Sequence, residues 1–171
     1  GDENIIAGNT GDGVHISGDL APAEGNIVKG NLIGFAPDEA KNGASNGGAG
    51  VRISGAASGN TIGGAYTTEA NTISYNLNGG IRCGNETVHN TFSHNSIYAN
   101  SAGGIILETG ANEDIAAPQL AVVGETTSGY APPNSVVELF ADTGEQGEVY
   151  ITSATASGSG DFWATIDLYA Y

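Results

Sequence analysis

Apolar and polar positions in the first two thirds of the chain follow one pattern that returns several times. Its clearest copy, residues 90–107, reads N-x-φ-x-x-N-x-φ-x-x-N-x-x-x-G-φ-x-φ, where φ is an apolar residue. Interrupted copies occupy residues 26–53 and 60–83, and a partial copy opens the chain. Internal repeats of this kind indicate a solenoid, in which each unit buries its apolar face against its neighbours.

The length of the repeat follows from its numbering. Ile81 and Ile105 hold equivalent places and lie 24 residues apart (105 − 81 = 24), whereas insertions lengthen the two preceding units. A coil of about 24 residues with several short strands is typical of a β-solenoid. The insertions fall in residues 35–45 and 64–70, which we expect to form loops that project from the solenoid.

Successive side chains of a strand point to opposite faces, so every second residue of each short strand is predicted to face inward. Nearly all of these residues are β-branched or aromatic, as strands favour. The predicted inward columns are Val28, Ile62 and Phe92; Ile6, Ile33, Ile73 and Ile97; Val14, Val51, Ile81 and Ile105; and Ile16, Ile53, Cys83 and Leu107. Between the last two columns, an outward column is predicted from His15, Arg52, Arg82 and Ile106.

Asparagine also recurs in columns, and each one stands where a predicted strand begins. Asn tolerates the left-handed backbone of a corner, bonds to nearby backbone, and can stack its amide on the next coil. We therefore interpret the columns as structural ladders rather than as a polar binding strip. The predicted ladders are Asn26, Asn60 and Asn90; Asn4, Asn31, Asn71 and Asn95; and Asn9, Asn46, Asn76 and Asn100. Turns are likewise expected at Gly13, Gly50, Gly80 and Gly104, each directly before a strand.

This skeleton resembles the right-handed parallel β-helix repeat of NosD-like and carbohydrate-associated domains in large secreted bacterial repeat proteins. The phrases that carry the resemblance are Gly-Asp-Gly-Val-His-Ile-Ser-Gly at 11–18, Gly-Asn-Ile-Val-Lys-Gly-Asn-Leu-Ile-Gly at 25–34 and Ser-Gly-Asn-Thr-Ile-Gly-Gly at 58–64. The resemblance covers residues 1–115 and implies a short β-helix of about four coils. It implies little about activity, because one scaffold hosts many functions.

Residues 116–171 do not follow the asparagine pattern of the repeat. The expected strands are Gln119–Val123, Val136–Ala141, Val149–Ala156 and Phe162–Leu168. Their spacing and turns predict a β-sandwich. Its predicted core residues are Val136, Leu139, Phe140, Ile151, Phe162 and Ile166, with Trp163 or its neighbours at the boundary. Residues 131–142 and 160–165 resemble bacterial Ig-like modules of surface proteins, and because a complete module needs about 100 residues, the resemblance implies a partial one.

Charge and composition disfavour some classes of binding partner. The 171 residues include 19 acidic side chains against 4 Lys+Arg, for a net charge of −15. Such a surface repels nucleic acid and anionic lipid, and no apolar run approaches the ~18 residues of a membrane span. The single cysteine, Cys83, is predicted to be a small buried side chain rather than a nucleophile or ligand. Because the chain lacks methionine and opens in mid-pattern, we interpret it as a processed or excised piece of a secreted protein.

Candidate chemistry is sparse. A polysaccharide lyase or hydrolase would need carboxylates clustered on one exposed face, whereas the acidic residues here fall mostly in corners and inserted loops. The outward column of His15, Arg52 and Arg82 is the most enzyme-like constellation, although a solvated face is the plainer interpretation. No catalytic, cofactor or metal site is predicted, and unspecific calcium binding by the acidic loops stays open.

The sequence therefore favours a non-catalytic extracellular module with a structural or adhesive role at the cell surface. A polysaccharide-binding or polysaccharide-degrading domain is the alternative, with glycans as partners. We also expect the chain to assemble with copies of itself, end to end or by strand addition, into a filament or surface layer. This expectation rests on solenoid ends without a capping helix and on a sandwich that lacks strands.

Overall fold

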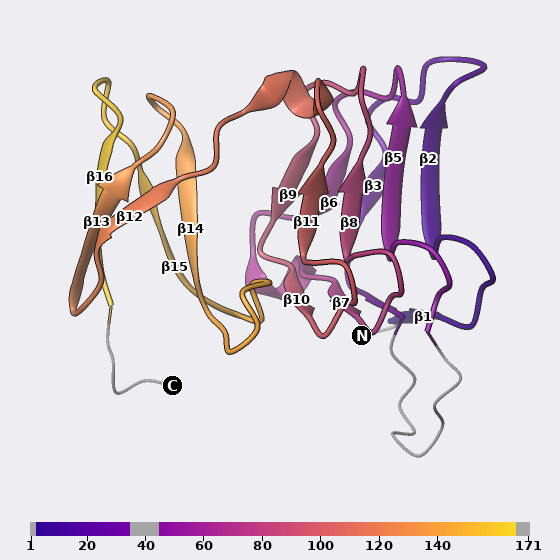
Figure 1. Ribbon diagram of the computed structural model, residues 1–171, viewed down its shortest axis with the longest axis horizontal. Coiled ribbons are helices and arrows are strands. Elements are labelled where there is room, and N and C mark those ends of the chain that lie inside the picture. Colours follow the sequence, from indigo (N-terminus) through magenta and orange to yellow (C-terminus); the bar gives the residue numbers. More distant parts are fainter. Residues whose placement is uncertain (1–2, 35–44, 167–171) are drawn as a thin grey trace. The chain divides into compact units, whose positions relative to one another are not determined.

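Short strands make up nearly all of the regular structure, so the protein belongs to the all-β class (Figure 1). The computed structural model describes residues 3–34 and 45–166. In this part of the chain the helical elements are two 3-10 turns, η1 (Thr67–Glu69) and η2 (Ala111–Asp114). Internal contacts divide the chain into two compact units. The first consists of Gly1–Asp114 with Asp142–Val149, and the second of Ile115–Ala141 with Tyr150–Tyr171.

The first unit is built from three parallel sheets. One sheet has the order β1-β4-β7-β10, with strands Asn4–Ile6, Asn31–Ile33, Thr72–Ser74 and Ser96–Tyr98. A second has the order β2-β5-β8-β11, with strands Val14–Gly18, Val51–Gly55, Ile81–Cys83 and Ile105–Leu107. The third has the order β3-β6-β9, with strands Ile27–Val28, Thr61–Gly63 and Thr91–Ser93. Because the chain passes from β3 to β4 to β5 and then repeats this path, it winds into what we call the coil stack.

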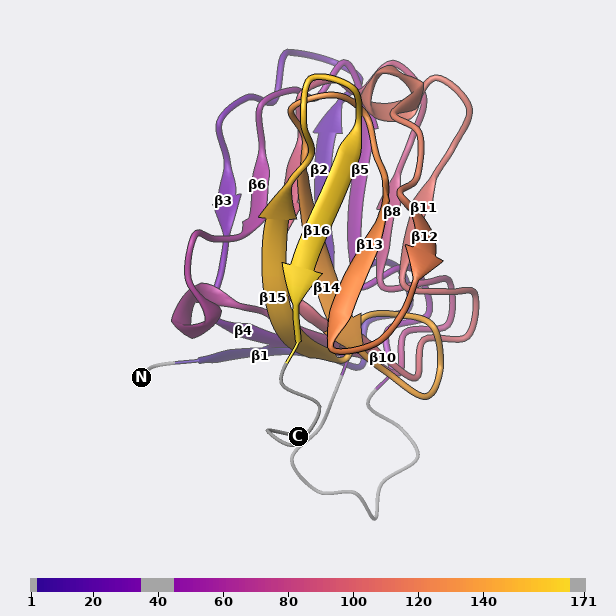
Figure 2. The ribbon, with the colours of Figure 1, turned by 90° about the vertical axis from the view of Figure 1, so that its left-hand side faces the viewer.

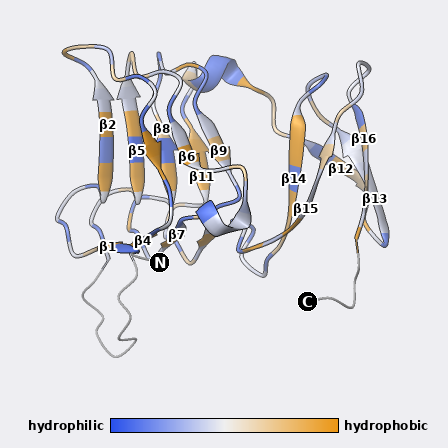
Figure 3. Ribbon diagram, turned by 180° about the vertical axis from the view of Figure 1, so that it is seen from behind, coloured by the Kyte–Doolittle hydropathy of each residue, from blue (hydrophilic) through white to orange (hydrophobic). Residues whose placement is uncertain are grey.

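Strand register in the coil stack confirms the predicted inward columns. Pairing joins Ile6 to Ile33, Ile73 to Ile97, and Ile53 to both Ile16 and Cys83. Most column members form one buried core, with Ile33, Ile53, Ile62, Ile73 and Ile81 fully inaccessible. The last members, Ile105 and Leu107, stay partly exposed because they lie on the terminal strand of their sheet. In Figure 3, β2 and β5 accordingly carry a hydrophilic band between hydrophobic bands.

The glycines that precede the strands of the second sheet lie at bends and also allow close stacking of the coils. Gly13, Gly50, Gly80 and Gly104 each lie at a bend of the chain, as predicted, and none of them has a positive φ. A Cβ on Gly50 would lie 2.8 Å from the carbonyl oxygen of Gly80, and one on Gly80 would lie 2.7 Å from that of Gly104. Each coil therefore approaches the next through a column of residues without side chains.

The corners of the coil stack place the left-handed residue one position before the ladder asparagine. Tyr75, His89, His94 and Ala99 have φ of 57°, 56°, 58° and 52°, and each directly precedes a ladder asparagine. The ladder asparagines themselves are not left-handed. Tolerance of that backbone is therefore the wrong explanation for asparagine here, and the side-chain amide must supply the reason.

The insertions differ in how far the structure describes them. Residues 64–70 form a short excursion that contains η1, and the Glu69 carboxylate folds back to accept from the Ala65 backbone N–H at 2.9 Å. Lys29 of the preceding coil donates to Glu69 at 2.7 Å, and this bond lowers the pKa of Glu69. The other predicted insertion, residues 35–45, lies outside the described residues except for Ser45.

The second unit contains two small sheets (Figure 2). One has the antiparallel order β12-β13-β16, with strands Gln119–Val122, Thr126–Tyr130 and Asp161–Thr165. The other pairs β14 with β15, which are Val136–Ala141 and Val149–Thr155. The sequence did not predict β13, because its Thr-Thr-Ser-Gly-Tyr run lacks an apolar alternation.

The core of the second unit corrects part of the predicted residue set. Its buried residues are Val137, Leu139, Ala156, Phe162 and Ala164, with Ile166 packed against them. Val136 is instead 66% exposed, because Val136 and Leu139 are three residues apart and face opposite sides of one strand. Phe140 faces away from Leu139 for the same reason and contacts Tyr150 edge to face, with ring centroids 5.7 Å apart. Ile151 is half-buried outside that core, and Trp163 is exposed, as expected for a boundary residue.

Candidate functional site

Buried asparagine side chains form three hydrogen-bonded ladders along the coil stack. In the ladder that begins at Asn9, the Nδ2 atoms of Asn9, Asn46 and Asn76 each donate at 2.9 Å to the Oδ1 of the next asparagine. The other two ladders repeat this geometry with Nδ2 to Oδ1 distances between 2.8 and 3.0 Å. These bonds join Asn4, Asn31, Asn71 and Asn95, and Asn26, Asn60 and Asn90.

Each ladder has a direction. The amide oxygen of an asparagine accepts from the coil before it, often from both Nδ2 and the backbone N–H, as Asn71 does from Asn31. The Nδ2 also donates back to a main-chain carbonyl of the preceding coil, as from Asn76 to Ile33 at 3.2 Å. The side-chain oxygen thus faces the N-terminal end, and the Nδ2 bond along the ladder faces the C-terminal end. At the N-terminal end Asn4 and Asn9 are exposed, and no described residue donates to their Oδ1 atoms.

Two side chains outside the repeat close ladders at the C-terminal end. Asn112 Oδ1 accepts from the Asn90 backbone N–H at 2.9 Å and from Asn90 Nδ2 at 3.4 Å. Gln146 Oε1 accepts from the Asn100 backbone N–H at 3.0 Å and from Asn100 Nδ2 at 3.2 Å. Both residues return a bond, with Asn112 Nδ2 donating to the Asn90 carbonyl and Gln146 Nε2 to the Asn100 carbonyl. Each amide therefore takes the part of an asparagine in a further coil.

The segment Asp142–Val149, which we call the cap segment, covers more of this end with its backbone. The Ile97 N–H donates to the Gly147 carbonyl at 3.0 Å, and the Ser96 hydroxyl donates to the Glu148 carbonyl at 2.7 Å. A Cβ on Gly104 would meet the Gln146 carbonyl oxygen at 2.6 Å, which continues the glycine column. The cap segment was not predicted from the sequence, since a single glutamine between two strands carries no repeat signal.

Asp142 holds the cap segment in shape. Its carboxylate accepts backbone N–H bonds from Gly144 and Gly147, both at 2.7 Å, and a shorter one from Gln146. These bonds lower the pKa of Asp142, and the bond from the Gly144 N–H contributes most. The ionised carboxylate thus preorganises the turn that presents Gln146 to Asn100.

The outward column of the second sheet is aligned as its sequence places it. His15, Arg52 and Arg82 pair in register on β2, β5 and β8. His15 Nε2 lies 2.9 Å from the Ser54 hydroxyl, and Arg82 Nε donates to Glu108 Oε1 at 2.8 Å. Arg52 is half-buried and its side chain bonds to no described residue.

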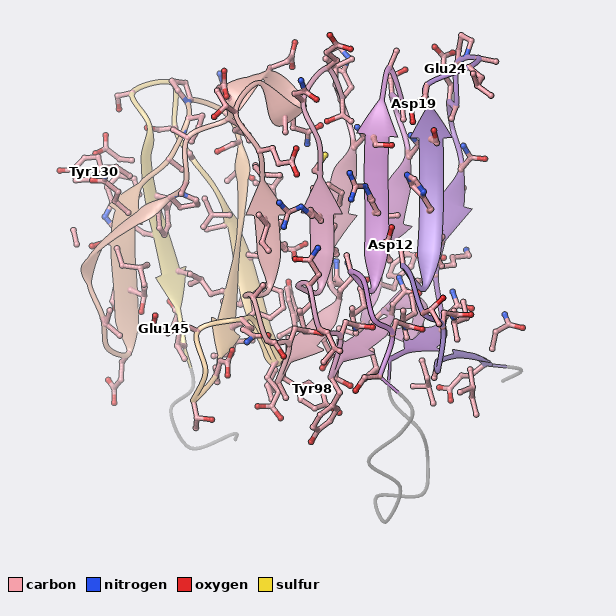
Figure 4. All side chains as sticks on the ribbon, turned by 45° about the vertical axis from the view of Figure 1, so that its right-hand side comes forward. Asp12, Asp19, Glu24, Tyr98, Tyr130 and Glu145 are labelled. Carbon is pink, nitrogen blue, oxygen red and sulfur yellow. The ribbon has the colours of Figure 1, made fainter. Side chains whose placement is uncertain are left out.

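The acidic residues of the first coil do not gather over this column. In Figure 4, Asp12 lies near the start of β2, while Asp19 and Glu24 lie beyond its other end. Asp12 accepts from the Ala49 backbone N–H at 2.7 Å and Asp19 from the Ser17 hydroxyl at 2.7 Å. These carboxylates are therefore used to hold corners, and among the described residues of this coil they provide no pair flanking one bond as glycoside hydrolysis needs.

Aromatic and metal-ligating side chains are equally dispersed. Tyr75 and Tyr98 contact edge to face with centroids 6.1 Å apart, which makes an aromatic pair rather than a row. Within residues 3–34 and 45–166 no group of three His, Cys, Asp or Glu residues could hold a metal ion. None of the helices in the same ranges has the length and apolar character to span a bilayer.

Cys83 is fully buried in its inward column, as predicted. Its Sγ lies 3.0 Å from the Thr87 hydroxyl, and burial raises the pKa of the thiol. A raised pKa and inaccessibility both suppress the thiolate, so the environment is that of an inert core residue.

No protein-family model matches the chain, and no curated protein matches it significantly. Its function is therefore inferred from its own residues.

Proposed function

We propose that the protein is a non-catalytic structural or adhesive module that acts outside the cell. In this proposal the coil stack is a right-handed parallel β-helix of the secreted repeat type, and the second unit is a partial Ig-like module. The main observation in its support is that the asparagine ladders run without interruption from the first coil to Asn112 and Gln146. The buried asparagine side chains are engaged in joining coils rather than in forming a reactive cleft.

A ladder of this kind suits a rigid spacer. Buried amides cost free energy unless they are hydrogen-bonded, and here each interior ladder amide both donates and accepts. Because every coil contacts its neighbours through the same bonds, stiffness is distributed along the stack. A surface that is strongly acidic keeps such a module soluble and discourages nonspecific contact with anionic polymers.

The test measures polysaccharide cleavage and the resistance of the chain to proteases. The full chain is incubated with neutral, acidic and amino polysaccharides, and the release of new reducing ends or unsaturated products is measured. The proposal expects no cleavage, together with resistance of the coil stack to proteases under native conditions. Cleavage of any polysaccharide that is lost in Arg52→Gln would overturn it in favour of an enzyme.

The environment of the Arg52 side chain favours a second function. Its guanidinium is half-buried on an outward column and has no partner among the described residues, whereas Arg82 is neutralised by Glu108. An unpaired guanidinium is a bidentate donor for a carboxylate. We therefore propose acidic glycans, such as uronate polymers, as ligands of this face in the alternative of a polysaccharide-binding module.

A matched pair of substitutions tests the glycan alternative. Arg52→Gln and Lys29→Gln remove one positive charge each, but Lys29 already pairs with Glu69 away from the outward column. Binding to a uronate oligosaccharide, measured by calorimetry, should fall at least about tenfold in Arg52→Gln and change little in Lys29→Gln. Equal losses would mean that only net charge matters, and no binding by the unaltered chain would remove the alternative.

A further inference from the structure

The two ends of the coil stack are complementary in their hydrogen-bonding groups. At the N-terminal end, β1 and β2 are the terminal strands of their sheets, and the exposed side chains of Asn4 and Asn9 present amide oxygens. At the C-terminal end, β10 and β11 are terminal in the same two sheets, and the ladder there ends on the donors of Asn100. Stacking β1 on β10 and β2 on β11 would continue both sheets in their parallel register.

The cap segment occupies the place that such a continuation would take. Gln146 Oε1 accepts the two bonds from Asn100 that Asn9 Oδ1 of another coil would accept. The Gln146 carbonyl oxygen lies over Gly104 as the Gly80 carbonyl lies over Gly50, a position that Gly13 of another copy would fill. The Gly147 carbonyl accepts from Ile97, as a carbonyl of an added strand would.

We infer that the C-terminal end of the coil stack is an interaction surface for the N-terminal coil of a second copy of this chain. The cap segment imitates that coil and blocks the surface until it is displaced. This inference rests on the proposed structural role, and it names the partner and the means by which assembly is restrained. Head-to-tail contacts of this kind are heterologous and propagate unless the rotation closes them.

Few residues hold the cap segment to the coil stack. Its bonds to the stack come from Gln146, Gly147 and Glu148, and its shape depends on the single carboxylate of Asp142. The ladder closed by Asn112 is separate from these contacts. An exchange of the cap segment for a second copy therefore replaces like bonds with like bonds, and the added copy contributes the further area of two strands.

The experiment uses the full chain with its cap weakened. Asp142→Ala combined with Gln146→Ala removes the carboxylate and the amide, and sedimentation velocity then follows mass against concentration. The unaltered chain should remain monomeric, whereas the uncapped chain should reach twice the monomer mass or more. Retained far-ultraviolet dichroism shows that the uncapped chain is folded.

A directional mixture separates specific docking from aggregation. Asn4→Ala with Asn9→Ala removes the acceptors of the N-terminal end, so the uncapped chain with these changes should be monomeric alone. Mixed with the unaltered chain it should give a one-to-one dimer and nothing larger, because one N-terminal end and one uncapped end are available.

Three outcomes overturn the inference. They are a monomeric uncapped chain with intact dichroism, association that persists unchanged after Asn4→Ala and Asn9→Ala, and absence of the mixed dimer. If the uncapped chain loses its dichroism, the cap is needed for folding itself and the blocking role is refuted. None of these results touches the proposed structural function, which is decided by the cleavage and protease assays.

Discussion

Gln146 stands over Asn100 as an asparagine of the next coil would, with Oε1 accepting both the backbone N–H and Nδ2 of Asn100. The two residues are 46 positions apart in the chain, well beyond the 24 residues of an uninterrupted coil. The end of a repetitive stack is thus closed by a side chain that belongs to no repeat. The chemistry of the ladder is therefore the same at this closed end as in its interior.

Removing an interior ladder amide should be costly. Asn76 is fully buried, accepts from Asn46 and donates to Asn100, so Asn76→Ala leaves buried partners unsatisfied. We expect a loss of about 3 kcal/mol in the free energy of unfolding, measured with urea. Asn9→Ala, at the exposed start of the same ladder, should cost about 1 kcal/mol. Equal losses of stability in the two variants would show that the position of an asparagine in its ladder does not affect its contribution.

The glycine column should not accept a methyl group. A Cβ on Gly50 would lie 2.5 Å from Ile73 Cγ2 and 2.8 Å from the Gly80 carbonyl oxygen. Gly50→Ala is therefore expected to destabilise the protein by about 1–3 kcal/mol, or more if the coils cannot separate. A Cβ on Gly11 would meet nothing within 4 Å, so Gly11→Ala should leave the stability almost unchanged. Both variants are compared with the unaltered chain by thermal unfolding. A neutral Gly50→Ala would contradict the close approach.

Cys83 should react with thiol reagents only after unfolding. Its side chain is inaccessible, and burial raises the pKa of the thiol, so both access and thiolate are lacking. The modification of the native chain, followed by mass spectrometry, should be negligible until denaturant is added. A Ser101→Cys variant, changed at an exposed site, should take up one label at once. Rapid native labelling of Cys83 would contradict the register of its column.

The cap segment should weaken in acid. The pKa of Asp142 is lowered by backbone N–H bonds, so its contribution to stability is present above the ordinary pKa of aspartate. That contribution is lost as the pH falls through the lower, folded-state pKa. The unaltered chain should therefore have a higher Tm than Asp142→Asn at neutral pH, and the gap should close in this acidic window. A gap that does not change with pH would show that the charge is irrelevant.

Some of the first unit could be predicted from residue order alone. Apolar residues at every second position, spaced 24 residues apart where no insertion intervenes, placed Ile73 beside Ile97 and Cys83 beside Leu107. The asparagine columns were visible for the same reason. A repeat transmits its register through identical neighbours, so local order and three-dimensional order coincide.

Prediction was less accurate where the local pattern has more than one physical meaning. A glycine before a strand suits a turn and also a close approach, and only the position of the Gly80 carbonyl showed that Gly50, which lies at a bend, serves the approach as well. In the second unit, Val136 was predicted to lie in the core, but its neighbour Val137 is the buried one. The polar strand β13 carries no alternation, since Gly129 and Ser128 supply backbone pairing rather than apolar area.

Sequence by itself determined the all-β class, the inward columns and the asparagine ladders, because these depend on contacts between equivalent residues of successive coils. The closure of the C-terminal end was decided only by tertiary structure. Gln146 reaches Asn100 because a distant turn, shaped by the Asp142 carboxylate, brings one amide to the open donors of the last coil. A single contact between residues far apart in the chain leaves no periodic trace, so its place could be read only from the folded molecule.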